Sequence, residues 1–345
     1  MVRRHVGHRL ELTTVADDEA VLHDGTTVVR LQALEPDTDY TEHGHSFRTL
    51  ARPGGERLAT VATVNDLHIG ETECGRYDGV DLGPVLRSEP GEDPYPETMS
   101  KAVVAEIAAL SPDAVVAKGD LTARGAVADV ATFLDHFVTA FDDRLHCLNG
   151  NHDVAGTGSA GLDAPPVAEV TLPGVRLALL DTSLPGRASG ALNADQLAWL
   201  DELGSRADRP VLVFGHHHPW NPGSPSRPAS YFGIEPGASE RLVDVFARRP
   251  TLAGYFAGHT HRNRVRRFAR TGDVPWVEVS AVKDYPGGWA EYRVYEGGVL
   301  QVFRRASAPE ALAWTERTRA LFGGLYPGYS FGSLADRCFA ITFAR

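Results

Sequence analysis

Five short clusters of metal-binding residue types are spread along the middle of the chain. In order they are Asp66-Leu67-His68, Gly119-Asp120, Gly150-Asn151-His152-Asp153, His216-His217-His218-Pro219 and Gly258-His259-Thr260-His261. Two divalent cations held about 3.5–4 Å apart need oxygen and imidazole donors from several segments, with one carboxylate able to bridge both ions. The clusters supply these donors, and they predict a dinuclear metal site.

The spacing within the clusters suggests how each donor is presented. In an extended segment alternate side chains point the same way, so Asp66 and His68 can reach one ion, as can His259 and His261. Asp120 is the natural bridging carboxylate, because the preceding glycine allows a tight turn. Asn151 offers a neutral carbonyl oxygen.

Each cluster follows an apolar, β-branched run that predicts a buried strand. These runs are residues 58–64, 114–117, 145–148, 211–214 and 254–256, and helical patterns lie between them at residues 98–110, 127–141 and 194–203. Strands that alternate with helices predict a layered α/β core in which functional residues follow the carboxyl ends of the strands. All five clusters are therefore expected at one edge of the sheets.

The ordered set of clusters resembles the calcineurin-like metallophosphoesterase superfamily over roughly residues 58–305. The resemblance implies an α/β fold, a four-layer αββα sandwich. A small N-terminal β module is expected before it at residues 1–57, and a C-terminal extension packed on the catalytic domain at residues 306–345. Leu34 to Tyr40 and Phe47-Arg48-Thr49 resemble part of a truncated fibronectin type III-like domain. Residues 70–97 and 221–237 are rich in turn-forming residues and are expected to be loops.

The resemblance also implies a role for each site residue. One ion takes Asp66, His68, His261 and the shared Asp120, and the other takes Asp120, Asn151, His259 and one histidine of residues 216–218. In the family this histidine commonly stands two positions before a proline, which selects His217, with His216 as an alternative ligand. His152 is the expected catalytic residue, which would protonate the leaving oxygen or stabilise charge in the transition state.

The implied activity is metal-dependent hydrolysis of a phosphate ester by attack of a metal-bridging hydroxide. Leu180-Asp181-Thr182-Ser183 and Gln196-Leu197-Ala198-Trp199-Leu200 look like bacterial class III cyclic-nucleotide phosphodiesterases and their glycerophosphodiesterase relatives. A small phosphodiester, such as a 3',5'-cyclic nucleotide, is therefore the expected substrate. The alternatives are a phosphomonoesterase or protein phosphatase of the same superfamily, and a non-catalytic binding protein that retains the fold.

The metals are not fixed by the donor set. Purple acid phosphatases place an iron-binding tyrosine three residues after the bridging aspartate, where this chain has Ala123. A stable ferric centre is therefore not expected. Imidazole and carboxylate donors fit Mn, Fe(II) or Zn, so the expected cofactors are two divalent metal ions.

The composition argues against nucleic acid and a membrane as partners. The formal net charge of −11 disfavours nucleic acid, and no apolar stretch approaches the roughly 18 residues of a membrane helix. The N-terminal sequence does not look like a secretory signal, which makes the cytoplasm the expected compartment. Three cysteines without close spacing predict no disulfide framework. A homo-oligomer is left open.

Overall fold

The structure is a computed structural model that describes residues 10–77, 80–156 and 162–343. Residues 1–9 of the expected N-terminal module, residues 78–79 of the first expected loop and residues 344–345 of the expected C-terminal extension lie outside the described residues. All predicted site residues lie within them. None of the helices in the described ranges is long and apolar enough to cross a membrane.

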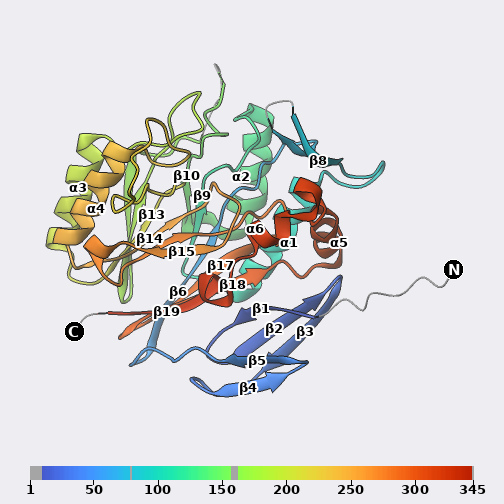
Figure 1. The fold of residues 1–345 in the computed structure, drawn as a ribbon, viewed down its shortest axis with the longest axis horizontal. Helices are drawn as coiled ribbons and strands as arrows, with labels where there is room; N and C mark the ends of the chain where they lie inside the picture. The colour runs from blue at the N-terminus through green and yellow to red at the C-terminus, as the bar shows by residue number, and fades with distance from the viewer. Residues whose placement is uncertain (1–9, 78–79, 157–161, 344–345) are drawn as a thin grey trace.

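Two mixed β-sheets pack face to face in the centre of the molecule (Figure 1). In the first, β9, β10 and β6 run parallel and the remaining neighbours pair antiparallel. Its order is β10 (Leu145–Leu148), β9 (Ala114–Lys118), β6 (Arg57–Val64), β17 (Gly288–Tyr295), β18 (Gly298–Arg305) and β19 (Cys338–Thr342).

In the second sheet, the strands from β12 to β16 are parallel and both edge strands pair antiparallel. Its order is β11 (Val167–Leu172), β12 (Val175–Leu180), β13 (Val211–Phe214), β14 (Leu252–Ala257), β16 (Pro275–Glu278) and β15 (Arg264–Arg267). Apolar side chains from both sheets, including Val61, Val116, Phe214, Phe256 and Tyr292, form the core between them.

Helices cover the outer face of each sheet, as Figure 1 shows. The first sheet is covered by α1 (Tyr95–Leu110), α2 (Val127–Phe141) and α5 (Pro309–Thr318), and the second by α3 (Ala194–Arg206) and α4 (Pro236–Arg248). Phe133, Phe137 and Phe141 are one helical turn apart on α2 and are fully buried, so this face holds the helix on its sheet. The predicted four-layer αββα sandwich is confirmed.

A small antiparallel β module precedes the sandwich, as predicted. Strands β1 (Glu11–Val15), β2 (Glu19–Asp24) and β3 (Thr27–Gln32) form one sheet, and β4 (Asp39–Glu42) pairs with β5 (His45–Arg48). The buried guanidinium of Arg293 on β17 joins the module to the first sheet through ion pairs with Asp17, Asp18 and Glu19. The fibronectin type III-like relationship stays a prediction.

The expected loop at residues 70–97 is wrong in part. It contains the hairpin of β7 (Cys74–Tyr77) and β8 (Val80–Leu86), and α1 begins within it at Tyr95. Its abundant turn residues hid the short strands from sequence reasoning. The second expected loop is irregular until α4 begins at Pro236.

The C-terminal segment returns to the first sheet. After α5 it forms the 3-10 helix η3 (Leu321–Gly324), α6 (Tyr326–Ser330) and α7 (Leu334–Arg337), and ends in the edge strand β19. Two further 3-10 helices are η1 (Asp142–Arg144) and η2 (Ala269–Thr271).

Candidate metal centre

The loops that follow β6, β9, β10, β13 and β14 bring the predicted donors together. Four overlapping groups have ligand atoms that all lie within 4.8 Å of one another. They are His216 with His217 and His259; Asp66 with His68 and His261; His68 with Asp120 and His152; and Asp66 with Asp120 and His216. Asp66, His68, Asp120 and His216 each belong to two of these groups, so the residues of the four groups form one continuous cluster.

Asp120 lies at the centre of the cluster. Its Oδ2 atom is 3.2 Å from Nε2 of His216 and 3.7 Å from Nε2 of His68. Its Oδ1 atom accepts a hydrogen bond from the backbone N–H of His152 at 2.8 Å. A Cβ on Gly150 would lie 2.2 Å from this oxygen, so only glycine permits the close approach.

Asp66 ties the first loop to the last one. Its Oδ2 atom accepts hydrogen bonds from the side chain of Asn65 at 2.6 Å and from the backbone N–H of His259 at 2.9 Å. Its Oδ1 atom is 3.4 Å from Nε2 of His261. The carboxylate therefore holds the two histidines of the last loop close to the first.

The backbone at the donors is unusual. Asp66, His68, Asp120, His259 and His261 have positive φ values between 51° and 70°. This left-handed region is unfavourable for residues with a Cβ and persists at functional sites where the surrounding structure imposes it. Asp66 with His68, and His259 with His261, were expected to lie in extended segments, and this expectation is wrong. The members of each pair nevertheless meet in the same cluster.

Several buried donor atoms have no hydrogen-bond partner among the described residues. Among them are Nε2 of His68, His216, His217 and His259, and Oδ1 of Asn151. Buried polar atoms almost always have partners, so a group of unpaired lone-pair donors is what a cation site requires. The residues present therefore fit the predicted pair of divalent ions.

The charges at the centre also suit cations. Burial alone would raise the pKa of Asp66, but the charge of His261 outweighs burial and lowers that pKa to about 2. His216 likewise lowers the pKa of Asp120 well below its ordinary value despite burial. Burial and neighbouring histidines lower the pKa values of His217 and His259 well below the usual range. Anionic carboxylates and neutral imidazoles are the forms that bind metals, so His261, whose pKa is raised to about 10 by Asp284 and Asp66 despite burial, would release a proton to hold an ion.

His152 is oriented by a backbone carbonyl. Its Nδ1 atom lies 3.0 Å from the carbonyl oxygen of Ala123, and its ring centre is 4.4 Å from that of His68. Asp153 does not orient it. The buried Asp153 carboxylate instead accepts hydrogen bonds from the backbone of Gly150 and Thr122 at 2.8 Å, which fastens the loop after β10 to the loop after β9.

Sequence reasoning missed the residues that support the histidines. Glu71 Oε2 is 3.1 Å from Nδ1 of His68, and Asp284 Oδ2 is 2.9 Å from Nδ1 of His261. Thr182 Oγ1 is 2.8 Å from Nδ1 of His217. None of these residues belongs to a ligand cluster in the sequence. Glu71 follows His68 by three residues, and this spacing could have indicated its supporting role. The position of Asp284 along the chain gave no such indication.

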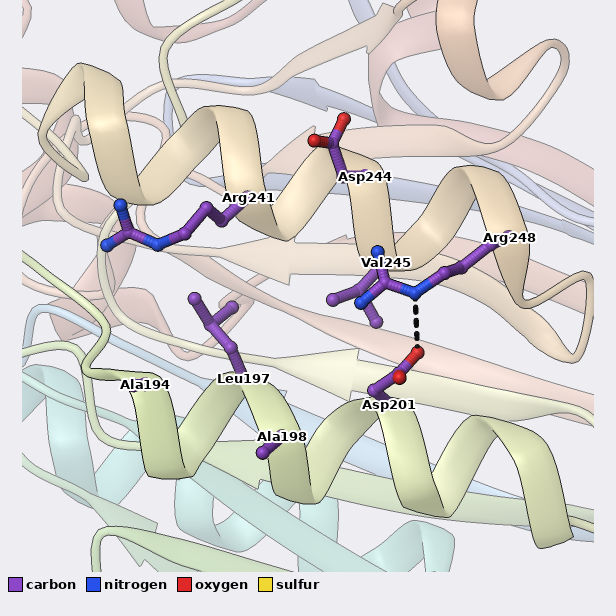
Figure 2. A pocket seen from close by; sticks show the side chains of 8 residues that line it. All are labelled: Ala194, Leu197, Ala198, Asp201, Arg241, Asp244, Val245 and Arg248. Atoms are coloured by element: carbon purple, nitrogen blue, oxygen red, sulfur yellow. Dashed lines mark hydrogen bonds and ion pairs between the residues drawn. The ribbon is translucent and has the colours of Figure 1, made fainter.

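A separate depression lies on the outer helical layer between α3 and α4. Figure 2 shows Leu197 and Val245 facing each other across it, with Arg248 bound to Asp201 at 2.9 Å. None of the predicted metal ligands lines this depression. It is therefore not the site of the expected chemistry.

Comparisons with known proteins agree with the fold. Residues 59–263 match the family model described as calcineurin-like phosphoesterase. The chain therefore belongs to the calcineurin-like phosphoesterase family, and the resemblance seen in the sequence is confirmed.

Two curated bacterial relatives are similar over part of the chain. A probable cyclic nucleotide phosphodiesterase of Rhodococcus erythropolis is 30% identical over 203 residues, which cover 56% of this chain and 62% of that protein. The alignment thus spans less than two thirds of that relative's length. The 3',5'-cyclic adenosine monophosphate phosphodiesterase CpdA of Pseudomonas aeruginosa is 30% identical over 215 residues, covering 61% of this chain and 72% of that protein.

A solved structure shares the fold. The dimetal phosphatase from Danio rerio superposes with a TM-score of 0.57 and 15% identity, and the match covers 84% of this chain and all of that chain. At this identity the likeness supports the α/β sandwich and carries no information on substrate.

Proposed function

We propose that the chain is a metal-dependent phosphodiesterase that hydrolyses a small phosphodiester such as a 3',5'-cyclic nucleotide. The observation that carries this proposal is the cluster of buried, unpaired imidazole and amide donors around Asp120. Asp66, His68, His261 and Asp120 would hold one ion, and Asp120, Asn151, His259 and His217 the other. When bound, the two ions supply Lewis acidity and an activated water.

The chain's own residues orient the reacting groups and donate a proton to the leaving oxygen. The carbonyl of Ala123 accepts a hydrogen bond from Nδ1 of His152, so the ring in its imidazolium form can donate the second proton, on Nε2, to the leaving oxygen of the ester and return to the neutral form. The backbone bonds accepted by Asp66 and Asp120 fix the carboxylates before substrate arrives. The names of the two curated relatives favour a diester over a monoester substrate.

The test combines metal content with turnover. Purified protein is stripped with a chelator, reloaded separately with Mn²⁺, Fe²⁺ and Zn²⁺, and assayed with a bis-aryl phosphate, a mono-aryl phosphate and 3',5'-cyclic nucleotides. We expect two ions per chain and faster cleavage of diesters. Asp120→Ala is expected to lose both ions and at least about a thousandfold in turnover, because several kcal/mol of transition-state stabilisation would be removed.

A matched control is Asp208→Ala, since Asp208 is an exposed carboxylate that pairs with Arg176 and Arg209 just before β13, at the opposite strand end from the site. It is expected to keep both ions and full activity. Preferential cleavage of monoesters would contradict the diesterase assignment. Turnover that survives in metal-free Asp120→Ala would contradict the metal-dependent mechanism itself.

A further inference from the structure

The C-terminal segment packs against the rear of the candidate metal centre. Helix α5 packs on α1 (Figure 1), and both α5 and α6 follow the last residue, 263, of the match to the family model. Tyr329 on α6 donates a hydrogen bond to the carbonyl of Thr260 at 2.8 Å, and Ser330 accepts one from the backbone N–H of Asn263 at 2.9 Å. The segment therefore touches the loop that carries His259 and His261.

One contact from this segment reaches a proposed ligand through a single carboxylate. The hydroxyl of Tyr326 donates to Oδ1 of Asp284 at 2.8 Å, and Oδ2 of Asp284 is 2.9 Å from Nδ1 of His261. Tyr326 and Asp284 are each 3% exposed. Because a carboxylate only accepts, Nδ1 of His261 carries the proton and its Nε2 faces Asp66 in the cluster.

A second carboxylate supports the other imidazole of the same proposed ion. Tyr95 donates to Glu71 at 2.7 Å, and Glu71 is 3.1 Å from Nδ1 of His68. Trp314 on α5 stacks on Tyr95 with ring centres 4.1 Å apart and donates to the carbonyl of Lys283 at 2.7 Å. The C-terminal segment thus contacts both supports, directly at Asp284 and through Tyr95 at Glu71.

We propose that the C-terminal segment completes the metal centre and that Tyr326 is a positioning residue, which aims His261 at its ion through Asp284. The inference rests on the proposed metal site. If the hydroxyl of Tyr326 is removed, Oδ1 of Asp284 loses its hydrogen-bond donor but stays buried. The carboxylate of Asp284 is then free to turn, and the imidazole of His261 loses its fixed orientation. Partners of this kind typically contribute a factor of about 10–100 to metal affinity.

The test measures Zn²⁺ affinity of the full chain by competition with a fluorescent chelator. Tyr326→Phe keeps the ring, which packs against Phe322 and Tyr329. We expect this variant to bind one of two ions at least about tenfold more weakly, with diesterase turnover restored by excess Zn²⁺. Asp284→Asn is expected to lose affinity at the same ion by a larger factor.

The control is Tyr295→Phe, which removes another buried tyrosine hydroxyl that donates to a carboxylate, Asp17, at 3.2 Å in the contact with the N-terminal module. It is expected to leave Zn²⁺ affinity unchanged. Wild-type binding of two ions with unchanged affinity in Tyr326→Phe would overturn the inference. If Tyr326→Phe does not fold by circular dichroism, unchanged affinity in Asp284→Asn overturns it instead. Wild-type protein that binds no Zn²⁺, Mn²⁺ or Fe²⁺ would refute the proposed metal site rather than the positioning role.

Discussion

Nε2 of His216 lies 3.2 Å from Oδ2 of Asp120, while its Nδ1 lies 2.8 Å from the carbonyl oxygen of Lys118. Both ring nitrogens therefore face oxygen acceptors. Burial alone would lower the pKa of His216, but the charges of Asp120 and Asp66 raise it to about 9. His217 differs in its neighbours, because its Nδ1 lies 2.8 Å from the hydroxyl of Thr182 and its Nε2, like that of His216 without a hydrogen-bond partner among the described residues, is grouped with the histidines His216 and His259.

His217 and His216 are the two alternative ligands of one proposed ion, and variants of each distinguish them. His217 is the proposed ligand because it stands two positions before Pro219, so we expect His217→Ala to bind one ion instead of two. His216→Ala is expected to keep both ions but to bind them more weakly, since Asp120 loses a neighbour that orients it. Metal analysis of the two dialysed variants makes the comparison. Loss of an ion in His216→Ala alone would reverse the assignment.

His152 is predicted to act on the leaving group. His152→Gln should keep both ions, and its turnover of a substrate with an alkoxide leaving group should fall by about a hundredfold or more. For a diester with a nitrophenolate leaving group, which departs without protonation, the loss should be much smaller. Steady-state kcat for both substrates gives the comparison. Equal losses would show that His152 does not serve as the proton donor.

The contact between the N-terminal module and the first sheet contains a buried charge. Arg293 is 4% exposed and pairs with Asp17, Asp18, Glu19 and Glu291. Arg293→Met leaves buried carboxylates short of a partner, and we expect a loss of about 3–5 kcal/mol in the free energy of unfolding. Urea unfolding followed by tryptophan fluorescence measures it.

The control for this variant is Arg48→Met. Arg48 pairs with Asp37 and Asp39, but all three side chains are at least half exposed. Exposed pairs are screened by water and contribute little, so the unfolding midpoint should scarcely move. Similar shifts in the two variants would contradict the importance assigned to burial.

His23 in the N-terminal module predicts a loss of stability in mild acid. Burial and the nearby charge of Arg305 lower its pKa to about 3, compared with about 6.5 in the unfolded chain. Between about pH 6.5 and pH 3, His23 therefore binds a proton in the unfolded chain but not in the folded protein. The contribution of His23 is complete above pH 6.5 and falls by up to about 1.4 kcal/mol per pH unit as pH drops from 6.5 toward 3.

Replacing this histidine should flatten the pH dependence. We expect His23→Gln to show a smaller difference in unfolding free energy between pH 7 and pH 5 than the wild-type chain. His43→Asn is the control, because His43 is exposed on the same module and asparagine tolerates its left-handed backbone. Equal slopes in His23→Gln and wild type would contradict the argument.

The strand-end clusters made much of the architecture predictable. Runs such as residues 114–117 and 211–214 are buried strands, and the residues after them meet in one cluster. The helical spacing of apolar residues also predicted α2, and the bounds of this helix, Val127–Phe141, are as predicted. These features depend on local pattern, which the sequence contains directly.

The supporting residues depend on contacts between distant segments. Asp284 is 23 residues beyond His261, and Tyr326 is 42 beyond Asp284. No spacing rule links them, because their meeting follows from how β17, β18 and the C-terminal helices fold back. The left-handed backbone at Asp66 and His259 is likewise imposed by the assembled loops.

The position of β6 in its sheet has a consequence for the order of events during synthesis. This strand carries Asp66 and His68 at its end, yet one of its two neighbours is β17, which begins at Gly288. A nascent chain emerges from the ribosome with its N-terminus first, so β6 must wait for more than 200 residues before its pairing is complete. Chains stalled on the ribosome before residue 288 are expected to expose the unpaired edge of β6 to proteases. Chains synthesised past β19 are expected to have this edge covered.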